Sequence, residues 1–149
     1  MPQVSLDLQY RYFGDTWGIR SHTGELGYTQ PWRNWIFDGS VRYYTQSHAD
    51  FYSDLFSAAN QQNFMSRNRE LSSFDSWTVG LGASYQFTMP YAHWIQKSTA
   101  NFRVDHFMFD YKDFRNALLI DPANGVPAGA EPLYTVQLNV FQLFLSVWY

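Results

Sequence analysis

Apolar and polar residues alternate along most of this chain. The final nine residues, FQLFLSVWY, place Phe141, Leu143, Leu145, Val147 and Tyr149 on one parity. A period of two puts these five side chains on one face of a β-strand. Similar alternation occupies residues 4–13, 16–29, 35–43, 77–87 and 100–111. The pattern therefore predicts six β-strands.

The last strand changes phase. Val136, Leu138 and Val140 lie on the parity opposite to that of the terminal apolar residues. One inserted residue reverses the facing of every later side chain in a strand. We therefore predict a β-bulge near Val140.

Strand length and composition favour a membrane-spanning sheet. Globular strands usually have about five or six residues, whereas a tilted strand needs about 9 to 11 to cross a bilayer. The chain has 149 residues, of which 20% are aromatic, yet its mean hydropathy is −0.37. Transmembrane barrels combine these properties because lipid-facing and lumen-facing residues alternate. No window approaches about 18 consecutive apolar residues, which excludes a transmembrane helix.

The connections between strands support the same fold. If strands alternate in direction, the two long connections, about 46–76 and 112–132, fall on the external side, where barrels carry their longer loops. Residues 30–33 and 89–97 then form the periplasmic connections, and residues 13–15 close a short external hairpin. Tryptophans fall near the two rims, as an aromatic girdle requires. The predicted girdle residues are Trp17, Trp32, Trp35, Trp77, Trp94 and Trp148.

The predicted fold class is all-β, an antiparallel transmembrane β-barrel. Residues 1–149 form a single β-barrel segment of about six meander strands. Because the smallest common barrels have eight strands, six cannot close alone. We expect either the C-terminal part of a larger barrel or several copies that pool their strands. The absence of a signal peptide after Met1 leads us to expect a mature product or a piece of a longer chain.

Seven charged residues fall on the polar parity of their strands. A charge facing hydrocarbon costs about 2 to 4 kcal/mol at mid-depth, so these side chains are predicted to face the lumen. There they line a water-filled path or pair across it. The predicted lumen-facing residues are Asp7, Arg11, Glu25, Asp38, Arg42, Arg103 and Asp105.

Candidate catalytic and metal-binding residues are few. His22 follows Ser21, but adjacent strand residues point to opposite faces and cannot form a dyad. A cation site built from His48, Asp50, Asp54 and Asp75 is the weaker alternative to solvated loop acids. The chain has no cysteine, which excludes disulfides and thiolate chemistry. We predict no catalytic, cofactor-binding or metal-binding residues.

The long connection 46–76 is predicted to be more than a passive linker. Unstructured loops beyond about 12 to 15 residues are usually functional or disordered. This loop carries several large apolar side chains and is predicted to pack partly over or into the barrel mouth. They are Phe51, Tyr52, Leu55, Phe56, Phe64 and Met65.

Four stretches carry a resemblance to known proteins. FQLFLSVWY resembles the C-terminal assembly signal of outer-membrane barrels. WGIRSHTGELGY (17–28), RYYTQSHADFY (42–52) and LSSFDS (71–76), the last followed by Gly80 and Gly82, resemble a family that carries only a "domain of unknown function" label, DUF3570. The resemblance to this bacterial family implies an outer-membrane β-barrel. Members of the family are much longer than this chain, and the matching motifs belong to their C-terminal half.

The expected function is that of a pore or scaffold in the bacterial outer membrane, without catalysis. Expected partners are outer-membrane lipid and lipopolysaccharide, the barrel-assembly machinery, and the remaining strands of the same barrel or further copies. A net charge of −3 without charge runs argues against nucleic acid. Two alternatives stay open: an outer-membrane enzyme acting on lipid or lipopolysaccharide, and a soluble β-barrel that binds a lipophilic ligand.

Overall fold

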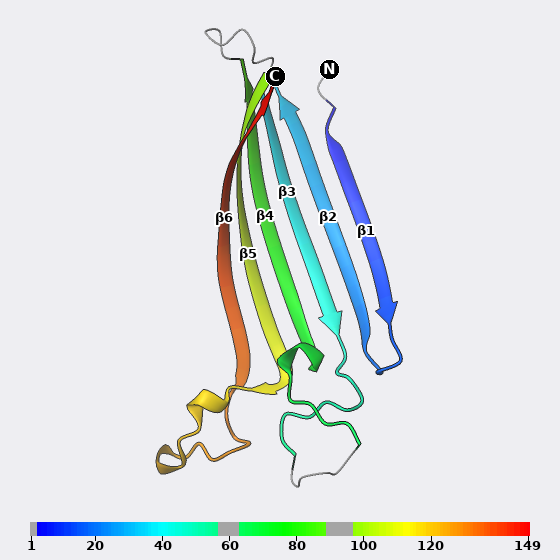
Figure 1. Cartoon of the computed structure of the whole chain (residues 1–149), viewed down its shortest axis with the longest axis vertical. Helices are drawn as coiled ribbons and strands as arrows, with labels where there is room; N and C mark the ends of the chain where they lie inside the picture. Colours follow the sequence, from blue (N-terminus) through cyan, green and yellow to red (C-terminus); the bar gives the residue numbers. More distant parts are fainter. Residues whose placement is uncertain (1–2, 57–62, 89–96) are drawn as a thin grey trace.

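One antiparallel sheet forms the body of the protein (Figure 1). The computed structural model describes residues 3–56, 63–88 and 97–149. Each strand pairs with the next in sequence, so the predicted six-stranded antiparallel meander is confirmed. The strands are β1 (Ser5–Gly14), β2 (Arg20–Trp32), β3 (Trp35–Gln46), β4 (Phe74–Phe87), β5 (Lys97–Arg115) and β6 (Leu133–Trp148).

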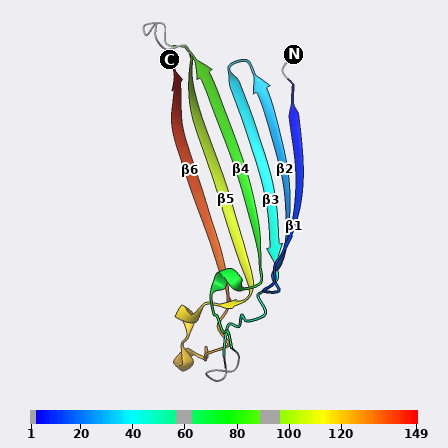
Figure 2. The same ribbon diagram turned by 45° about the vertical axis from the view of Figure 1, so that its right-hand side comes forward.

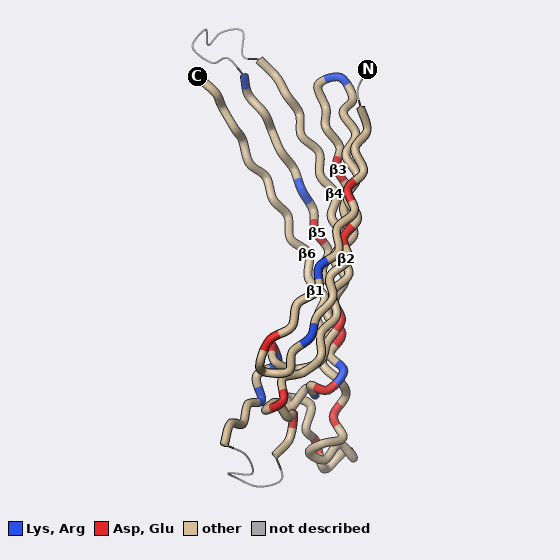
Figure 3. Tube along the Cα trace, turned by 90° about the vertical axis from the view of Figure 1, so that its right-hand side faces the viewer, with Lys and Arg blue, Asp and Glu red and all other residues tan. Residues whose placement is uncertain are grey.

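The sheet is open and twisted. Within the described residues β1 and β6 are the two edge strands and do not pair with each other. The strands fan out at the loop end in one view (Figure 1) and at the opposite end in the perpendicular view (Figure 3). This is the twist expected of extended L-residue strands. An open six-stranded meander is consistent with part of a barrel.

Within residues 3–56, 63–88 and 97–149, helical structure is confined to single turns. These are the 3₁₀ turns η1 (Arg69–Leu71), η2 (Ala117–Leu119) and η3 (Pro122–Asn124). In the part of the chain that the structure describes, none of the helices has the length and apolarity needed to cross a membrane.

The connections are sorted between the two ends of the sheet. The β1–β2 turn and the long connections 47–73 and 116–132 lie at one end, here called the loop end (Figures 1 and 2). The tight β2–β3 turn lies at the other end, together with both labelled chain termini. Trp32 and Trp35 pair beside that turn, where Arg33 adopts a φ of 54°.

The β1–β2 turn differs from the prediction. β2 begins at Arg20 rather than near Thr16, so residues 15–19 form the turn. The Asp15 carboxylate accepts hydrogen bonds from the backbone N–H groups of Trp17 and Ile19, which stabilises a turn conformation over strand. Gly18, with a φ of 84°, completes the turn in the left-handed region.

The sheet has two chemically different faces, set by its register. One row across the strands contains Leu8, Leu26, Val41 and Val79, and it belongs to what we call the apolar face. Side chains of this face are open, with Leu81 66% and Leu143 75% exposed. The opposite side, called the polar face, contains the row Asp7, Gly27, Ser40, Gly80 and Asp105.

The small hydrophobic core lies in the loops and not beneath the sheet. Ile19, Ala49 and Tyr52 are buried together, and Phe51, Leu71 and Phe114 pack against them. A sheet whose large apolar side chains remain uncovered needs another apolar medium or partner.

The bulge expected near Val140 is wrong. The β5–β6 ladder is continuous from Lys97↔Trp148 to Asp110↔Thr135, and its irregularity lies between Asp110 and Arg115. The two apolar sets of β6 therefore lie on opposite faces. Val136, Leu138 and Val140 join the polar face, where Phe107 and Phe109 neighbour them. We call these five residues the inner apolar patch.

On the apolar face of the same two strands, polar residues take the place of apolar ones. His106 and Asn139 are register partners there, and His106 Nδ1 lies 2.7 Å from Asn139 Oδ1. Both faces of β5 and β6 thus change polarity toward the loop end without any break in the ladder.

Candidate functional site

An ion cluster centred on Arg103 crosses the polar face. Arg103 Nη1 donates to Asp38 Oδ2 at 2.8 Å, and its Nη2 lies 2.9 Å from Asp105 Oδ1. Nη2 also donates to Ser40 Oγ at 3.0 Å. Asp105 is 7% exposed and is thus the most enclosed member. The guanidinium joins β3 to β5 although β4 lies between them.

Two glycines of β4 make this bridge sterically feasible. Gly82 lies between Asp38 and Arg103 in the register, and Gly80 lies between Ser40 and Asp105. A Cβ at Gly82 would overlap the Asp38 carboxylate, and one at Gly80 would overlap Arg103 Nη2 and Asp105 Oδ1. The glycines let the ion cluster lie flat against the sheet.

All seven charges predicted for the lumen lie on the polar face by register, but they do not form one network. Asp38, Arg103 and Asp105 make the ion cluster. Within the described residues no ion pair holds Asp7, Arg11, Glu25 or Arg42, although Glu25 and Arg42 are register partners. Arg11, Glu25 and Arg42 line a cavity of about 250 Å³ instead.

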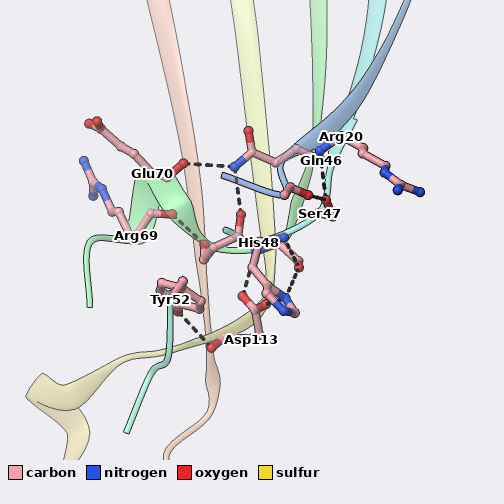
Figure 4. A network of polar contacts seen from close by, with 11 residues as sticks. Arg20, Gln46, Ser47, His48, Tyr52, Arg69, Glu70 and Asp113 are labelled. Carbon is pink, nitrogen blue, oxygen red and sulfur yellow. Dashed lines mark hydrogen bonds and ion pairs between the residues drawn. The ribbon is translucent and has the colours of Figure 1, made fainter. Parts of the chain in front are cut away.

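A second polar network ties the 47–73 connection to the end of β5 at the loop end (Figure 4). His48 Nδ1 lies 3.1 Å from Asp113 Oδ2 and 3.1 Å from Ser73 Oγ. Asp113 Oδ1 accepts the backbone N–H of Ser73 at 2.8 Å, and the Asp113 carbonyl accepts the Tyr52 hydroxyl at 3.0 Å. Asp113 thus joins the end of β5 to both arms of the 47–73 connection.

A buried carboxylate reinforces this network. Asp54, 7% exposed, accepts hydrogen bonds from Arg67 Nε and from Arg115 Nη1, each at 3.2 Å. Burial raises the pKa of the nearby Tyr52 phenol, and the negative charges of Asp113 and Asp54 raise this pKa further. Because its pKa is raised, Tyr52 stays protonated and can donate a hydrogen bond at pH values where an ordinary tyrosine ionises.

The geometry at His48 is that of a tether and not of a nucleophilic triad. A triad places the acid on one imidazole nitrogen and the nucleophile on the other. Here Ser73 and Asp113 both approach Nδ1. His22 also departs from a catalytic arrangement, because its Nδ1 lies 2.7 Å from the Tyr10 hydroxyl on the apolar face.

The residues considered for a cation site are engaged elsewhere. Asp75 pairs with Lys112 at 2.8 Å and Asp54 pairs with arginines. The Asp50 carboxylate lies against Gly18, where an added Cβ would overlap it. Over the described ranges no group of three or more His, Cys, Asp or Glu side chains is placed to hold a metal ion.

The tryptophans lie toward the two ends of the sheet. Trp77 packs against Tyr43 near the loop end of β4, with the ring centroids 4.7 Å apart, and Trp17 lies on the β1–β2 turn. Trp35 packs on Tyr85 at 4.6 Å at the opposite end, where Trp32 and Trp148 also lie. Trp94 falls outside the described residues.

The sequence did not point to several participants, among them Arg67 and Arg115, which bind Asp54. Ser40, Ser73 and Asp113 were not singled out, although each completes a polar network. Ser40 had a usable signal, because it shares the parity of Asp38 on β3. Ser73 and Asp113 had none, since only folding of the loops brings them to His48.

The fold and these sites define a class of protein: an open antiparallel meander with one apolar face, one charged face and a structured loop end. Residues 1–119 match the family described as "Protein of unknown function (DUF3570)", so the chain belongs to this family. Searches of curated proteins and of solved structures found no match to the chain.

Proposed function

We propose that this chain forms part of the wall of a bacterial outer-membrane β-barrel that acts as a pore or scaffold and performs no catalysis. The observation that carries the proposal is the exposed apolar face opposite a charged face. In a membrane, lipid covers the apolar face, and the charged face lines an aqueous interior. A soluble barrel that encloses a lipophilic ligand would place these faces the other way round.

The spacing of the aromatic pairs supports the proposal. The Tyr43–Trp77 and Trp35–Tyr85 pairs lie on the same two strands and belong to the apolar face. Tyr85 lies eight positions after Trp77, which corresponds to roughly 27 Å at a rise of about 3.4 Å per residue. Aromatic girdles of outer-membrane barrels flank an apolar band about 25 Å tall. At a strand tilt of about 35–45° this length projects to about 19 to 22 Å along the membrane normal, somewhat less than the height of the band.

The polar face supports a filled or narrowed interior more than a wide channel. Arg103 is held by three side chains of the same face. A guanidinium fixed in this way supplies a positive centre flanked by two carboxylates. In a pore it would act on charged solutes, and in a scaffold it would hold the wall together.

Membrane fractionation followed by heat-modifiable gel mobility tests the proposal. The protein is expressed with its native upstream sequence, and the outer membrane is separated and dissolved in mild detergent. A band that migrates as a compact species unheated and shifts after boiling supports a closed barrel. Recovery in the soluble fraction without detergent would overturn the proposal. Conductance across a planar bilayer, compared between wild type and Arg103→Gln, then distinguishes a pore from a scaffold.

The enzyme alternative is less well supported, because His22 and His48 are both engaged through Nδ1, and among the described residues no nucleophile is hydrogen-bonded to the other nitrogen. Lipid or lipopolysaccharide modification that disappears in His48→Ala, while the compact gel band persists, would favour it over our proposal.

A further inference from the structure

We infer that the inner apolar patch, together with the 3₁₀ turn η1, forms a binding site for a single-chain amphiphile with an anionic head group. The inference deepens the proposed function and rests on it in one respect, that the polar face encloses an interior. Its starting point is an apolar surface in a place where the rest of the face is charged.

The register between β5 and β6 fixes the patch on the polar face. Because the β5–β6 ladder is continuous over this region, Val136, Leu138 and Val140 are fixed on the polar face. Phe107 and Phe109 lie beside them on β5. Five neighbouring apolar side chains next to an aqueous interior are unfavourable unless an apolar partner covers them.

A cavity of about 340 Å³ lies over this patch. Its apolar lining comes from Phe109, Val136 and Leu138, and is extended toward the loops by Phe74 and Tyr111. Ligand sites usually measure about 300 to 1,000 Å³, so this cavity falls at the lower end of the range. That size suits one alkyl chain better than a two-chain lipid.

The loop end of the cavity carries charge. Arg69 and Glu70 of η1 line it together with the apolar residues. Two other arginines nearby, Arg67 and Arg115, are both paired with Asp54. By contrast, no ion pair within the described residues holds Arg69. An anionic head group would gain a charge-assisted contact from Arg69, and Glu70 disfavours more than one negative charge.

The described apolar side chains of the 47–73 connection do not line the cavity over the patch. Residues 57–62, SAANQQ, belong to the same long connection but are polar or small. The side chains that make up this segment would bury little apolar surface against phenylalanine and leucine. A ligand with an alkyl chain is therefore a better occupant than this segment on chemical grounds.

Photolabelling of the intact protein in its membrane fraction tests the site. The probe is dodecanoate carrying a diazirine in its alkyl chain, and dodecanol with the same diazirine is the uncharged control. Labelled peptides are mapped by mass spectrometry. We expect label on Phe107, Phe109 or Leu138, which belong to the patch, in addition to label on the lipid-facing residues Leu143 and Leu145.

Two variants make the result specific. Leu138→Gln should reduce patch labelling by both probes, while Leu143→Gln on the opposite face of the same strand should leave it unchanged. Arg69→Gln should reduce patch labelling by dodecanoate about fivefold relative to dodecanol, the loss of roughly one charge-assisted contact. Equal reduction of the two probes would overturn the anionic head group.

The position of the label distinguishes failure of the binding site from failure of the proposed function. Label on the apolar face alone would overturn the site and leave a membrane barrel. Label on the patch alone would support the site and overturn the membrane-facing role of the apolar face. Label on neither face would overturn both.

Discussion

Arg103 and Asp38 are joined across an intervening strand, with Arg103 Nη1 2.8 Å from Asp38 Oδ2. The contact passes over Gly82 and is backed by Asp105 on the strand of Arg103 itself. It links β3 to β5 independently of the backbone ladder, so changes at this position test the interior of the sheet directly.

Removal of the Arg103 guanidinium should destabilise the sheet. Arg103→Met leaves the enclosed Asp105 carboxylate without its partner, which costs about 1 to 3 kcal/mol in the free energy of unfolding. Urea unfolding of the detergent-folded protein, followed by tryptophan fluorescence, measures this loss. Arg42→Met is the control, because Arg42 lies on the same face outside the ion cluster and should change stability less. An equal loss in both variants would contradict the role of the cluster.

Gly82→Ala should abolish the coupling between Arg103 and Asp38. The added methyl group overlaps the Asp38 carboxylate, so the ion pair must separate. A double-mutant cycle with Arg103→Met and Asp38→Asn reports the coupling energy, about 1 kcal/mol or more for the pair in wild type. We expect it to approach zero in the Gly82→Ala background. Gly39→Ala, whose new Cβ meets Leu81 at an ordinary 3.6 Å, should leave the coupling intact.

Leu81→Arg tests the surroundings of the apolar face. Leu81 lies in the middle of β4 and is 66% exposed. If lipid covers this face, the substitution costs about 2 to 4 kcal/mol in stability. In water an arginine at such an open position would be nearly neutral. Thr78→Arg on the polar face of the same strand is the matched control, and equal effects of the two variants would argue against a lipid-covered face.

Asp113→Ala should release the 47–73 connection from the end of β5. It removes the acceptor of the Ser73 N–H and a partner of His48, so amide hydrogen exchange at Ser73 should accelerate about tenfold or more, equivalent to about 1.4 kcal/mol. Mass spectrometry of peptides from 63–73 follows this change. Asp110→Ala, at an exposed position of the same strand, should leave exchange there unaltered.

Tyr52 should be among the last tyrosines to ionise. Burial and two carboxylates raise its pKa in the folded protein, so its contribution to stability is complete below the unfolded pKa of about 10 and is lost as pH rises through the folded pKa. Absorbance titration at alkaline pH compares wild type with Tyr52→Phe. The missing transition should lie above the main tyrosine titration. Loss of a tyrosine that titrates with the others would contradict the raised pKa.

Parity along the chain was sufficient to predict the six strands and to place Asp38, Arg103 and Asp105 on one face. It was insufficient to pair them, because pairing depends on the register between β3, β4 and β5. The bulge prediction failed for a related reason. A change of phase in the apolar pattern was interpreted as an irregular backbone, but the backbone of β6 is regular there, and the apolar residues move from one face of the strand to the other. The loop network lay beyond parity altogether, since His48 and Asp113 are 65 positions apart in sequence.

The two glycines of β4 have a consequence for how this family can diversify. Because positions 80 and 82 carry no side chain, β4 contributes only backbone beneath the ion cluster. The polar side chains of the cluster come from β3 and β5. Substitutions at positions 38, 40, 103 and 105 together change the charge of this region without any change in β4. Any side chain gained at 80 or 82 would instead displace the cluster as a whole.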